Sequence, residues 1–598
     1  MASEKLSRIS KNRSRTQKHS SILSKPISVF CWRVFYWVFL CVLFLGLAVL
    51  FSWPLSKDFA HTIIGQRDFT DGPFFMWNLW WVKKAFSLGL NPLFTNYVYY
   101  PAYANLTLHT FTFTSAILAW PILRFFSLIS SLNILLFFSM VATGVGMCVL
   151  IYYLTRNRYA GIISGIIFTF SPNIFAHLMA GHYNLGMLWP FPWIVLFFLR
   201  MLREESRLNA VAFALFLSAQ FYLDLQMSSA VGIILIVIFI GYAISSPQKT
   251  FSLRRLQSYT IALAIFLAFF LVPYLRWMNG FLKVKFGEET YNNGDLAVIF
   301  GSNPLSSLFG GGKFELISKM VGSYRENTIS LGLTVIATAI LSFAFCKDYI
   351  REKIIFFVLA ALGIILALGP NLQINDIVNE KIKLPFYYLS RLPLFNVGVV
   401  PSRYIVIAFF ALAVLAGFFC AGVLSRLKFK YSFLLATAFI LVVCGLVSLE
   451  YYSAPLKVDK IEVSPIYSRI AAEKGNFTVL PAFAQPRDAY FQTVHSKKVV
   501  SGYLSRRVHK YYLMQYAGVP GIRPLVFGDL NQFSADDLNR SKVVETYKKY
   551  EIKYVICDKT THNPSLVGKV KRYLGDTLKL PVYAEDEMVV VYQVDNQN

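Results

Sequence analysis

The sequence predicts an all-α polytopic membrane domain of about 11 transmembrane helices plus a re-entrant or partial segment, followed by a C-terminal extracytoplasmic α/β domain. The 598 residues are 56% hydrophobic and 15% charged, whereas soluble domains average about 25% charged residues. The mean hydropathy is +0.51, and apolar runs of about 18 residues or more recur along the chain. These features exclude a wholly soluble enzyme and a disordered chain.

The positive charge predicts topology. A net charge of +26 would suggest nucleic-acid binding in a soluble protein. Here much of the excess lies in short loops between apolar runs, which is typical of cytoplasmic loops, and we expect no nucleic-acid partner. Residues 1–29 are predicted to be a basic cytoplasmic tail, because residues 1–26 carry seven Lys and Arg side chains against one acid.

The first apolar run, 30–53, is too long for a signal peptide, and we interpret it as an uncleaved first span. Basic loops then alternate with less basic connections, so residues 54–110, 277–326, 371–401 and everything after 450 are expected to face outward. The remaining apolar segments lie near 111–128, 131–154, 159–178, 184–202, 208–224, 227–246, 258–276, 327–346, 353–370, 402–424 and 431–450.

Segment 111–128 contains Pro121 and Arg124. If it crossed fully, the chain after 450 would return to the cytoplasm, against the basic loop 426–430, so we expect a re-entrant or partial segment. The predicted domains are 30–450, a transmembrane domain with its first outer loop at 54–110, and 451–598, an extracytoplasmic α/β domain.

The C-terminal part carries strand-like runs and two polar helical stretches, near 535–549 and 564–574. The seven cysteines show no paired spacing, so neither a disulfide framework nor a zinc site is predicted from them. The expected strands lie at Phe477–Leu480, Lys498–Val500, Tyr554–Ile556 and Met588–Tyr592.

The first outer loop holds the acidic candidates Asp68 and Asp71, just before a Trp-rich stretch. The indoles of Trp77, Trp80 and Trp81 would share one helical face, and we expect this helix to lie along the outer membrane interface. Asp71 stands as a possible N-cap of that helix. The alternative is a general base at the membrane–water boundary, where a lipid-borne substrate meets its acceptor.

Further candidates lie at other outer edges. His177 and His182 are five residues apart and would not share a helical face, so zinc binding is not expected and both are predicted to line a polar pocket. His109 is interpreted as an interfacial hydrogen-bonding residue or a pocket residue. Asp224 lies at the outer end of an apolar run. An ionisable group there indicates either a functional site or a carboxylate that simply reaches the membrane interface.

The third outer connection holds Arg391 and Arg403. Arg403 begins an apolar span from its outer end, where the positive-inside rule disfavours a cation. Its guanidinium would suit a phosphate ester, and the alternative is a side chain that extends to lipid phosphate. No Gly-rich phosphate loop, nucleophile elbow, HExxH or paired CxxC motif occurs, so a nucleotide-sugar or ATP site is unsupported.

In these motifs the sequence resembles the GT-C superfamily of polytopic membrane glycosyltransferases, closest to its large prokaryotic branch. The resemblance runs in order across residues 30–510. It includes Asp71-Gly72-Pro73, Trp77-Asn78-Leu79-Trp80-Trp81, Asn91-Pro92-Leu93-Phe94, Tyr100-Pro101, Asn105-Leu106, His109, Phe170-Ser171-Pro172, His177, Gly181-His182, Leu384-Pro385 and Val400-Pro401-Ser402-Arg403.

The resemblance implies inverting transfer of a sugar from a polyprenyl-phosphate carrier to a glycan, lipid or protein acceptor on the outer face of the membrane. Asp71 matches the family's first-loop aspartate, with Asp68 as an alternative or second member. Arg403 would bind the carrier phosphate, and His109, His177, His182, Asp224 and Arg391 are further candidates for substrate binding. The sequence lacks an Asp-X-Asp pair, so no metal or other cofactor is predicted.

Two other classes of protein fit a polytopic chain. A transporter or lipid-linked glycan flippase is expected to show internal repeats and polar residues near the bilayer midplane, whereas the polar candidates here cluster at the outer edge. A non-catalytic membrane scaffold would keep the architecture and bind a glycan through its outer domain. Replacement of Asp71 by Asn would leave a scaffold working and abolish an enzyme.

Overall fold

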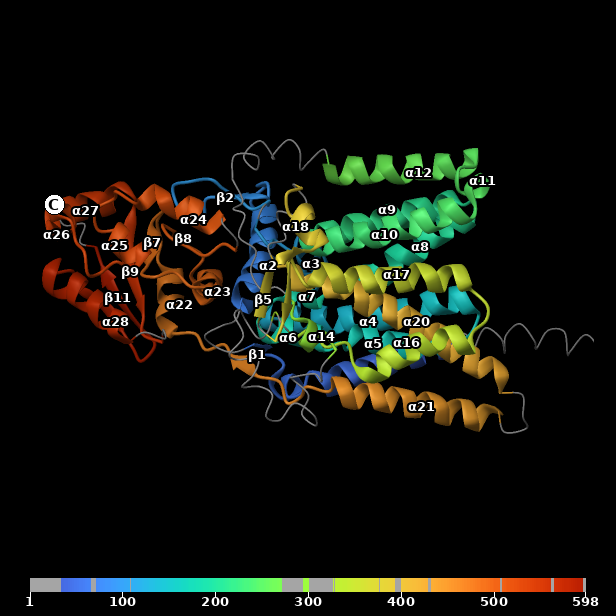
Figure 1. Ribbon diagram of the computed structural model, residues 1–598. Coiled ribbons are helices and arrows are strands. Elements are labelled where there is room, and N and C mark those ends of the chain that lie inside the picture. The colour runs from blue at the N-terminus through green and yellow to red at the C-terminus, as the bar shows by residue number, and fades with distance from the viewer. Residues whose placement is uncertain are drawn as a thin grey trace, which may run out of the picture.

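A computed structural model of the protein describes residues 34–65, 71–107, 109–271, 294–300, 326, 328–375, 377–392, 400–427, 432–505, 508–560 and 564–594. The predicted tail 1–29 and Asp68 lie outside the described residues. Figure 1 shows a bundle of long helices with an α/β part beside one of its ends. We call that end of the bundle, where Asp71 and Arg403 lie, the site end. The opposite end, where Arg203 and Arg351 lie, is the far end.

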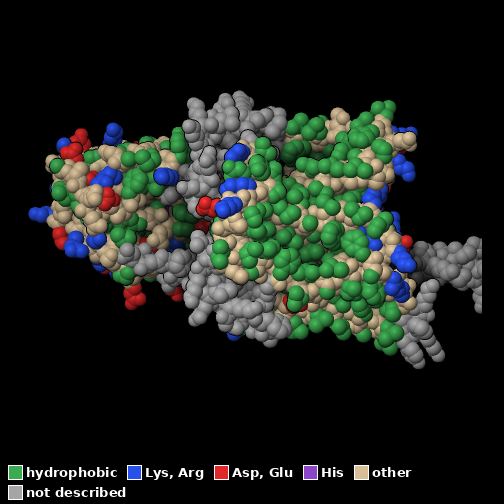
Figure 2. Space-filling model, in the orientation of Figure 1, with side chains coloured by type: hydrophobic (Ala, Val, Ile, Leu, Met, Phe, Trp, Pro, Cys, Tyr) green, Lys and Arg blue, Asp and Glu red, His purple; other side chains and the backbone are tan. Residues whose placement is uncertain are grey.

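Among the described residues, six helices are long and apolar enough to cross a membrane. Hydrophobic side chains cover much of the visible face of the bundle, and Lys and Arg gather at its far end (Figure 2). The protein is therefore a multi-pass membrane protein. The six are Val34–Phe51, α4 (Leu128–Thr155), α5 (Ala160–Thr169) with α6 (Pro172–Met179), α10 (Leu225–Ser245), η4 (Pro401–Tyr404) with α20 (Ile405–Arg426), and α21 (Ser432–Tyr451).

Shorter helices complete the bundle. They are α3 (Phe113–Ile122), α8 (Pro190–Arg203), α9 (Arg207–Phe221), α12 (Leu253–Phe266) with η2 (Leu267–Leu271), α16 (Leu333–Phe345) and α17 (Ile350–Ala367). Helix α3 has 10 residues and contains Pro121. At 1.5 Å per residue it spans about 15 Å, half of a bilayer core of about 30 Å. Helix α3 is thus shorter than a full span, and the partial or re-entrant character of 111–128 stays a prediction.

Helix α20 forms the centre of the bundle, and its apolar span is buried throughout. It packs against α5, α16 and α17. The contact with α17 depends on a small residue, because a Cβ atom at Gly363 would lie 2.6 Å from the backbone nitrogen of Ala408. Close packing through small residues is the usual way in which helices associate in membranes, where water supplies no hydrophobic driving force between them.

The α/β part contains a five-stranded mixed sheet of order β10-β11-β9-β7-β8. Strands β7 and β9 run parallel, and β11 pairs antiparallel with β9. Four of the strands and both helical stretches agree with the sequence prediction, and β10 was not predicted. The strands are β7 (Thr478–Pro481), β8 (Lys498–Val499), β9 (Ile552–Asp558), β10 (Val582–Glu585) and β11 (Val589–Gln593); the helices are α22 (Pro465–Ala472), α23 (Pro486–His495), α24 (Val508–Leu513), α25 (Arg523–Phe527), α26 (Ala535–Leu538), α27 (Arg540–Lys549) and α28 (Pro564–Lys571), with η5 (Met514–Tyr516) and η6 (Arg572–Thr577).

Short elements lie between the bundle and the sheet. Strand β1 (Thr62–Ile64) from the first loop pairs antiparallel with β6 (Val458–Lys460), so the chain that leaves α21 is tied back to the first loop. The others are η1 (Leu55–Asp58), α2 (Gly72–Ser87), β2 (Phe94–Thr95), β3 (Ala104–Asn105), α7 (Tyr183–Gly186), α11 (Pro247–Thr250) at the far end, α14 (Leu296–Ile299), β4 (Asn371–Ile374), β5 (Ile377–Lys383) and α18 (Pro385–Leu389).

Helix α2 corrects the expectation of an interfacial Trp helix. Its indoles do gather, but Trp77 and Trp81 are only 2% and 0% exposed. Helix α2 packs against α23 of the α/β part, and Trp77 Nε1 donates to Gln492 Oε1 at 2.8 Å. Lys84 lies over the rings of Trp80 and Tyr97. The indole face is covered by protein because the α/β part docks on it.

We expect Gly363→Ala to lower the thermal midpoint of the detergent-solubilised protein. The added methyl group would press on the α20 backbone, and overpacking of this kind costs about 1–3 kcal/mol. The matched control is Gly232→Ala in α10, where a Cβ atom meets nothing within 4 Å. An equal midpoint for the two variants would contradict the close α17–α20 contact.

Candidate functional site

Five side chains from distant parts of the chain meet at the site end of the bundle, and we call them the site cluster. They are Asp71 before α2, His177 in α6, His182 before α7, Glu326 between α14 and α16, and Arg403 in η4. Each has an ionic contact of no more than 3.7 Å with another member. The geometry therefore brings the sequence candidates His177, His182 and Arg403 to one shared carboxylate, and His182 connects Asp71 to them.

The two histidines meet because the helix between them ends. Helix α6 stops at Met179, and Gly181 takes a left-handed φ of +77°, as is common where a helix terminates. The backbone nitrogen of His182 donates to the carbonyl of His177 at 2.9 Å, and the two Nδ1 atoms are 3.4 Å apart. A spacing of five residues therefore does not keep the two imidazoles apart, because the helix that would separate them ends between them.

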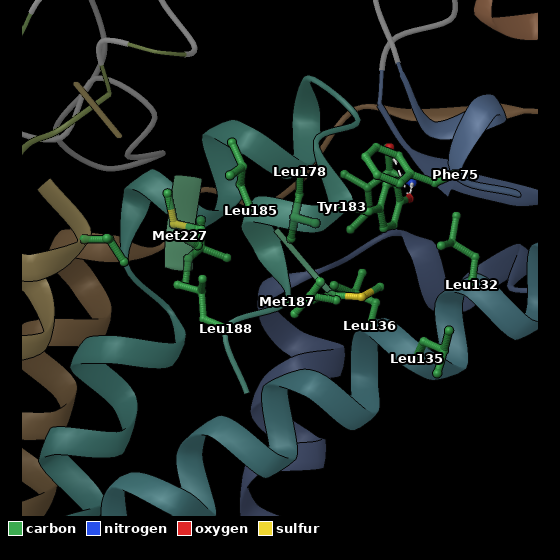
Figure 3. Close-up of a cluster of buried hydrophobic side chains, with 14 of the residues drawn as sticks. Phe75, Leu132, Leu135, Leu136, Leu178, Tyr183, Leu185, Met187, Leu188 and Met227 are labelled. Carbon is green, nitrogen blue, oxygen red and sulfur yellow. Dashed lines mark hydrogen bonds between the residues drawn. The ribbon is translucent and has the colours of Figure 1, made fainter. Parts of the chain in front are cut away.

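Apolar packing holds this turn in place. Leu178, Leu185 and Tyr183 belong to a buried hydrophobic cluster that includes Phe75 of α2 (Figure 3). The Tyr183 hydroxyl accepts from the backbone nitrogen of Ile64 at 3.0 Å, which fixes the turn to β1. Rigid packing of this kind keeps the side chains of His177 and His182 in a defined geometry.

Glu326 is the centre of the site cluster. Its carboxylate accepts from Arg403 Nε at 3.1 Å and lies 3.7 Å from His177 Nδ1 and 3.6 Å from His182 Nδ1. The side chain is 5% exposed. Burial by itself would raise the pKa of Glu326, but Arg403 and the imidazoles outweigh it and hold this pKa below its usual range. The residue is therefore a buried, ionised carboxylate.

Asp71 faces the cluster from the first loop. Its Oδ2 lies 3.6 Å from His182 Nε2, and its Oδ1 accepts from the Tyr503 hydroxyl at 3.3 Å. It occupies the N-cap position of α2 but makes no side-chain capping bond, so the carboxylate is turned to the cluster. Burial raises the pKa of Asp71 to about 6, against the opposing effects of the Tyr503 hydrogen bond and of Arg403.

Arg403 is held in the protein instead of extending to the membrane surface. Besides Glu326, its Nη1 donates to Gln226 Oε1 at 3.2 Å, and Gln226 Nε2 donates to the carbonyl of Val400. Its side chain is 18% exposed. The bonds to described residues use three of the five guanidinium N–H groups, which leaves part of the fork to meet an anion.

Three other sequence candidates lie outside the cluster. Asp224 caps α10 and accepts from Asn184 Nδ2 at 2.8 Å, and it lines a narrow cavity of about 30 Å³ together with His109. His109 is buried and contacts Ser505 Oγ at 2.9 Å. Arg391 is exposed and bonds to Tyr387, so the geometry does not bring it to the cluster.

Sequence reasoning missed Glu326, Gln226 and Tyr503. Glu326 is one of five acids in residues 277–326, and no motif marks it out. Tyr503 reaches Asp71 from 432 residues away. No local pattern carries a contact of that separation, so only the docking of the α/β part reveals it.

The cluster has donor atoms that suit a divalent cation. One ligand atom each of His177, His182 and Glu326 lies within 4.8 Å of the others. Two imidazole nitrogens and a carboxylate form a set that transition metals such as zinc or manganese accept, with positions left for other ligands. The residues present therefore fit a metal ion, and Asp71 stands next to the set.

Comparisons with known proteins identify the fold. No protein-family model matches the sequence, and no curated protein does. Among solved structures, the arabinofuranosyltransferase AftD from Mycobacteria superposes with a TM-score of 0.52 at 11% identity, covering 94% of this chain and 40% of AftD. The chain thus spans less than half the length of AftD.

Two further structures cover most of the chain. ArnT from Cupriavidus metallidurans has a TM-score of 0.49 at 12% identity, covering 95% of this chain and 98% of ArnT. The archaeal oligosaccharyltransferase AglB from Archaeoglobus fulgidus has a TM-score of 0.46 at 12% identity, covering 88% and 69%. The likeness to AftD shows that this chain shares the fold of that arabinofuranosyltransferase, in line with the resemblance of its motifs to the GT-C superfamily.

We expect Glu326→Gln to destabilise the protein strongly. Arg403 would remain buried without its counter-charge, and breaking a buried pair costs about 3–5 kcal/mol. The matched control is Glu205→Gln, which removes a surface partner of Arg254 and is worth at most about 1 kcal/mol. Thermal unfolding in detergent measures both, and equal shifts would contradict the buried pair.

Proposed function

We propose that the protein is an inverting glycosyltransferase that moves a sugar from a polyprenyl-phosphate carrier to an acceptor. The single observation that carries this proposal is the carboxylate of Asp71, with a pKa of about 6, beside His182 and the buried Arg403–Glu326 pair at the site end of the bundle. A base with a raised pKa near the working pH suits deprotonation of a hydroxyl. The GT-C fold supports the same class of reaction.

In the proposed reaction Asp71 accepts the proton of an acceptor hydroxyl. The hydroxyl oxygen attacks the anomeric carbon from the side opposite the carrier, so configuration inverts. The bond between that carbon and the carrier phosphate oxygen breaks, and polyprenyl phosphate leaves with the electron pair. The protein's part is to align the three atoms and to hold negative charge on the phosphate.

Arg403 is the proposed contact for the carrier phosphate. Its guanidinium is fixed by Glu326 and Gln226, so little side-chain entropy is lost when it meets an anion. His177, His182 and Glu326 would hold a divalent cation, which would supply positive charge beside the phosphate. The carboxylate of Glu326 would thus orient both the guanidinium of Arg403 and the divalent cation.

The proposed orientation follows the charge of the loops. Lys and Arg side chains gather at the far end of the bundle (Figure 2), which the positive-inside rule assigns to the cytoplasm. The site end and the α/β part would then face outward. A polyprenyl-linked donor would reach the site from the outer leaflet, and the acceptor would come from the aqueous side.

We expect Asp71→Asn to lower sugar transfer by at least about 10²-fold, because a general base contributes roughly that factor or more. The assay uses purified protein, a panel of polyprenyl-phosphate sugars and a membrane extract as the acceptor source, with and without chelator. The matched control is Asp58→Asn, an exposed aspartate of the same loop, which should keep wild-type transfer. Equal donor binding by wild type and Asp71→Asn without turnover of any donor would favour a transporter or scaffold.

The pH dependence tests the role of Asp71 separately. The base acts when ionised, so transfer should fall as the pH drops through about 6. The Tyr503 hydrogen bond lowers the pKa of Asp71, and Tyr503→Phe should therefore move the acidic limb of the pH–rate profile to higher pH. Tyr511→Phe, at an exposed tyrosine nearby, should leave the limb unchanged. A limb that moves in neither variant would contradict this assignment.

A further inference from the structure

A second polar cavity lies at the far end of the bundle, where α8, α10, α11, α12 and α17 begin or end. Its volume is about 720 Å³. Helix α10 connects Asp224 at the site end to Ser245 at this cavity, a rise of about 30 Å for its 21 residues. The cavity is therefore separate from the site cluster and has no part in the reaction proposed there.

The lining of this cavity carries excess positive charge. Among the described residues it holds four cations, Arg203, Lys249, Arg255 and Arg351, against the single carboxylate of Glu352. Arg203 Nη2 and Arg351 Nη2 both donate to Glu352 Oε1 at 2.7 Å. One carboxylate balances one of these charges, so the lining retains a surplus that suits an anion.

Two of the guanidinium groups are fixed in advance. The guanidinium of Arg351 lies 4.0 Å from the ring centroid of Tyr242, and that of Arg203 donates through Nε to the Tyr242 hydroxyl at 2.6 Å. Arg351 Nη1 also points to the hydroxyls of Ser245 and Ser246, each at 3.4 Å. Preformed donors of this kind bind a phosphate oxygen without a large loss of side-chain freedom.

Arg255 provides a second, independent indication of a ligand. It is 7% exposed, and it donates to the carbonyl groups of Lys249 and Arg203. Among the described residues, no carboxylate forms an ion pair with Arg255, and no group accepts a hydrogen bond from its Nε. A buried cation without a counter-charge is costly, and an anion in the cavity would supply that charge.

The surface around the cavity is apolar. Ile244, Leu253 and Ile350 are 78%, 74% and 55% exposed, and they lie on the same helix ends that carry the cations. Such side chains are expected to contact acyl chains, whereas a site for a soluble phosphate ester needs no lipid-facing rim. We propose that this cavity binds the phosphodiester headgroup of an anionic lipid in the leaflet at the far end.

The experiment measures the thermal midpoint of the purified full-length protein in detergent as phosphatidylglycerol is added. A ligand that binds only the folded state stabilises it by RT ln(1 + [L]/Kd), so this midpoint rises with the ligand concentration. Phosphatidylcholine is the neutral lipid arm, and inorganic phosphate and glycerol phosphate are the soluble arms. Native mass spectrometry counts the lipid molecules retained on each variant.

The variants separate a built site from general surface charge. Lys249→Gln and Arg351→Gln should each weaken phosphatidylglycerol binding about fivefold, while Lys249→Arg should keep it. Arg254→Gln is the matched control, because Arg254 neighbours Arg255 on α12 but is 79% exposed and outside the cavity. Lys249 is itself exposed, so its replacement is not expected to impair folding.

The expected result is a midpoint raised by phosphatidylglycerol in wild type, Lys249→Arg and Arg254→Gln, with weaker binding in the two Gln variants of the cavity. Three results would overturn the proposal. Phosphatidylcholine could act as strongly as phosphatidylglycerol, Arg254→Gln could lose as much as Lys249→Gln, or inorganic phosphate or glycerol phosphate could raise the midpoint equally. The last result would assign the cavity to a soluble phosphate ester.

Discussion

A carboxylate at the edge of a membrane stays buried and ionised only when a cation pairs with it, and the site depends on this constraint at Glu326. Arg403 bonds to it directly, and His177 and His182 face it from the turn after α6. Because Arg403 lies just before α20, the ion pair also ties Glu326 to the centre of the bundle. The ion pair between Glu326 and Arg403 therefore sets the position of the site.

The α/β part completes this site as well as covering it. Tyr503 bonds to Asp71, Ser505 bonds to His109, and Gln492 bonds to Trp77 of α2. Its side chains thus set the environment of the candidate base, and its docking buries the indoles. An aspartate that sequence alone places on a wet membrane surface becomes partly desolvated, which is the physical origin of its raised pKa.

The two ends of the bundle use positive charge in different ways. At the site end, the charge of Arg403 is balanced by that of Glu326, so little positive charge is left over. At the far end, the cavity holds four cations and one carboxylate, and the surplus of positive charge lies beside exposed apolar side chains. The first arrangement suits a charge that develops during a reaction. The second suits a permanent anion such as a lipid headgroup.

The sequence by itself determined the membrane-embedded class, four of the five strands of the C-terminal sheet with two of the helical stretches there, and Asp71 and Arg403 as candidates, because hydropathy, periodicity and charge at a span edge are local signals. The tertiary structure decided the rest. Glu326 lies 77 residues from Arg403, and Tyr503 lies 432 residues from Asp71. The Trp face of α2 is covered by the α/β part, whose Gln492 lies 415 residues from Trp77. Contacts at such separations arise from the packing of whole helices and sheets. A local pattern of residue types therefore does not predict which buried charges will pair.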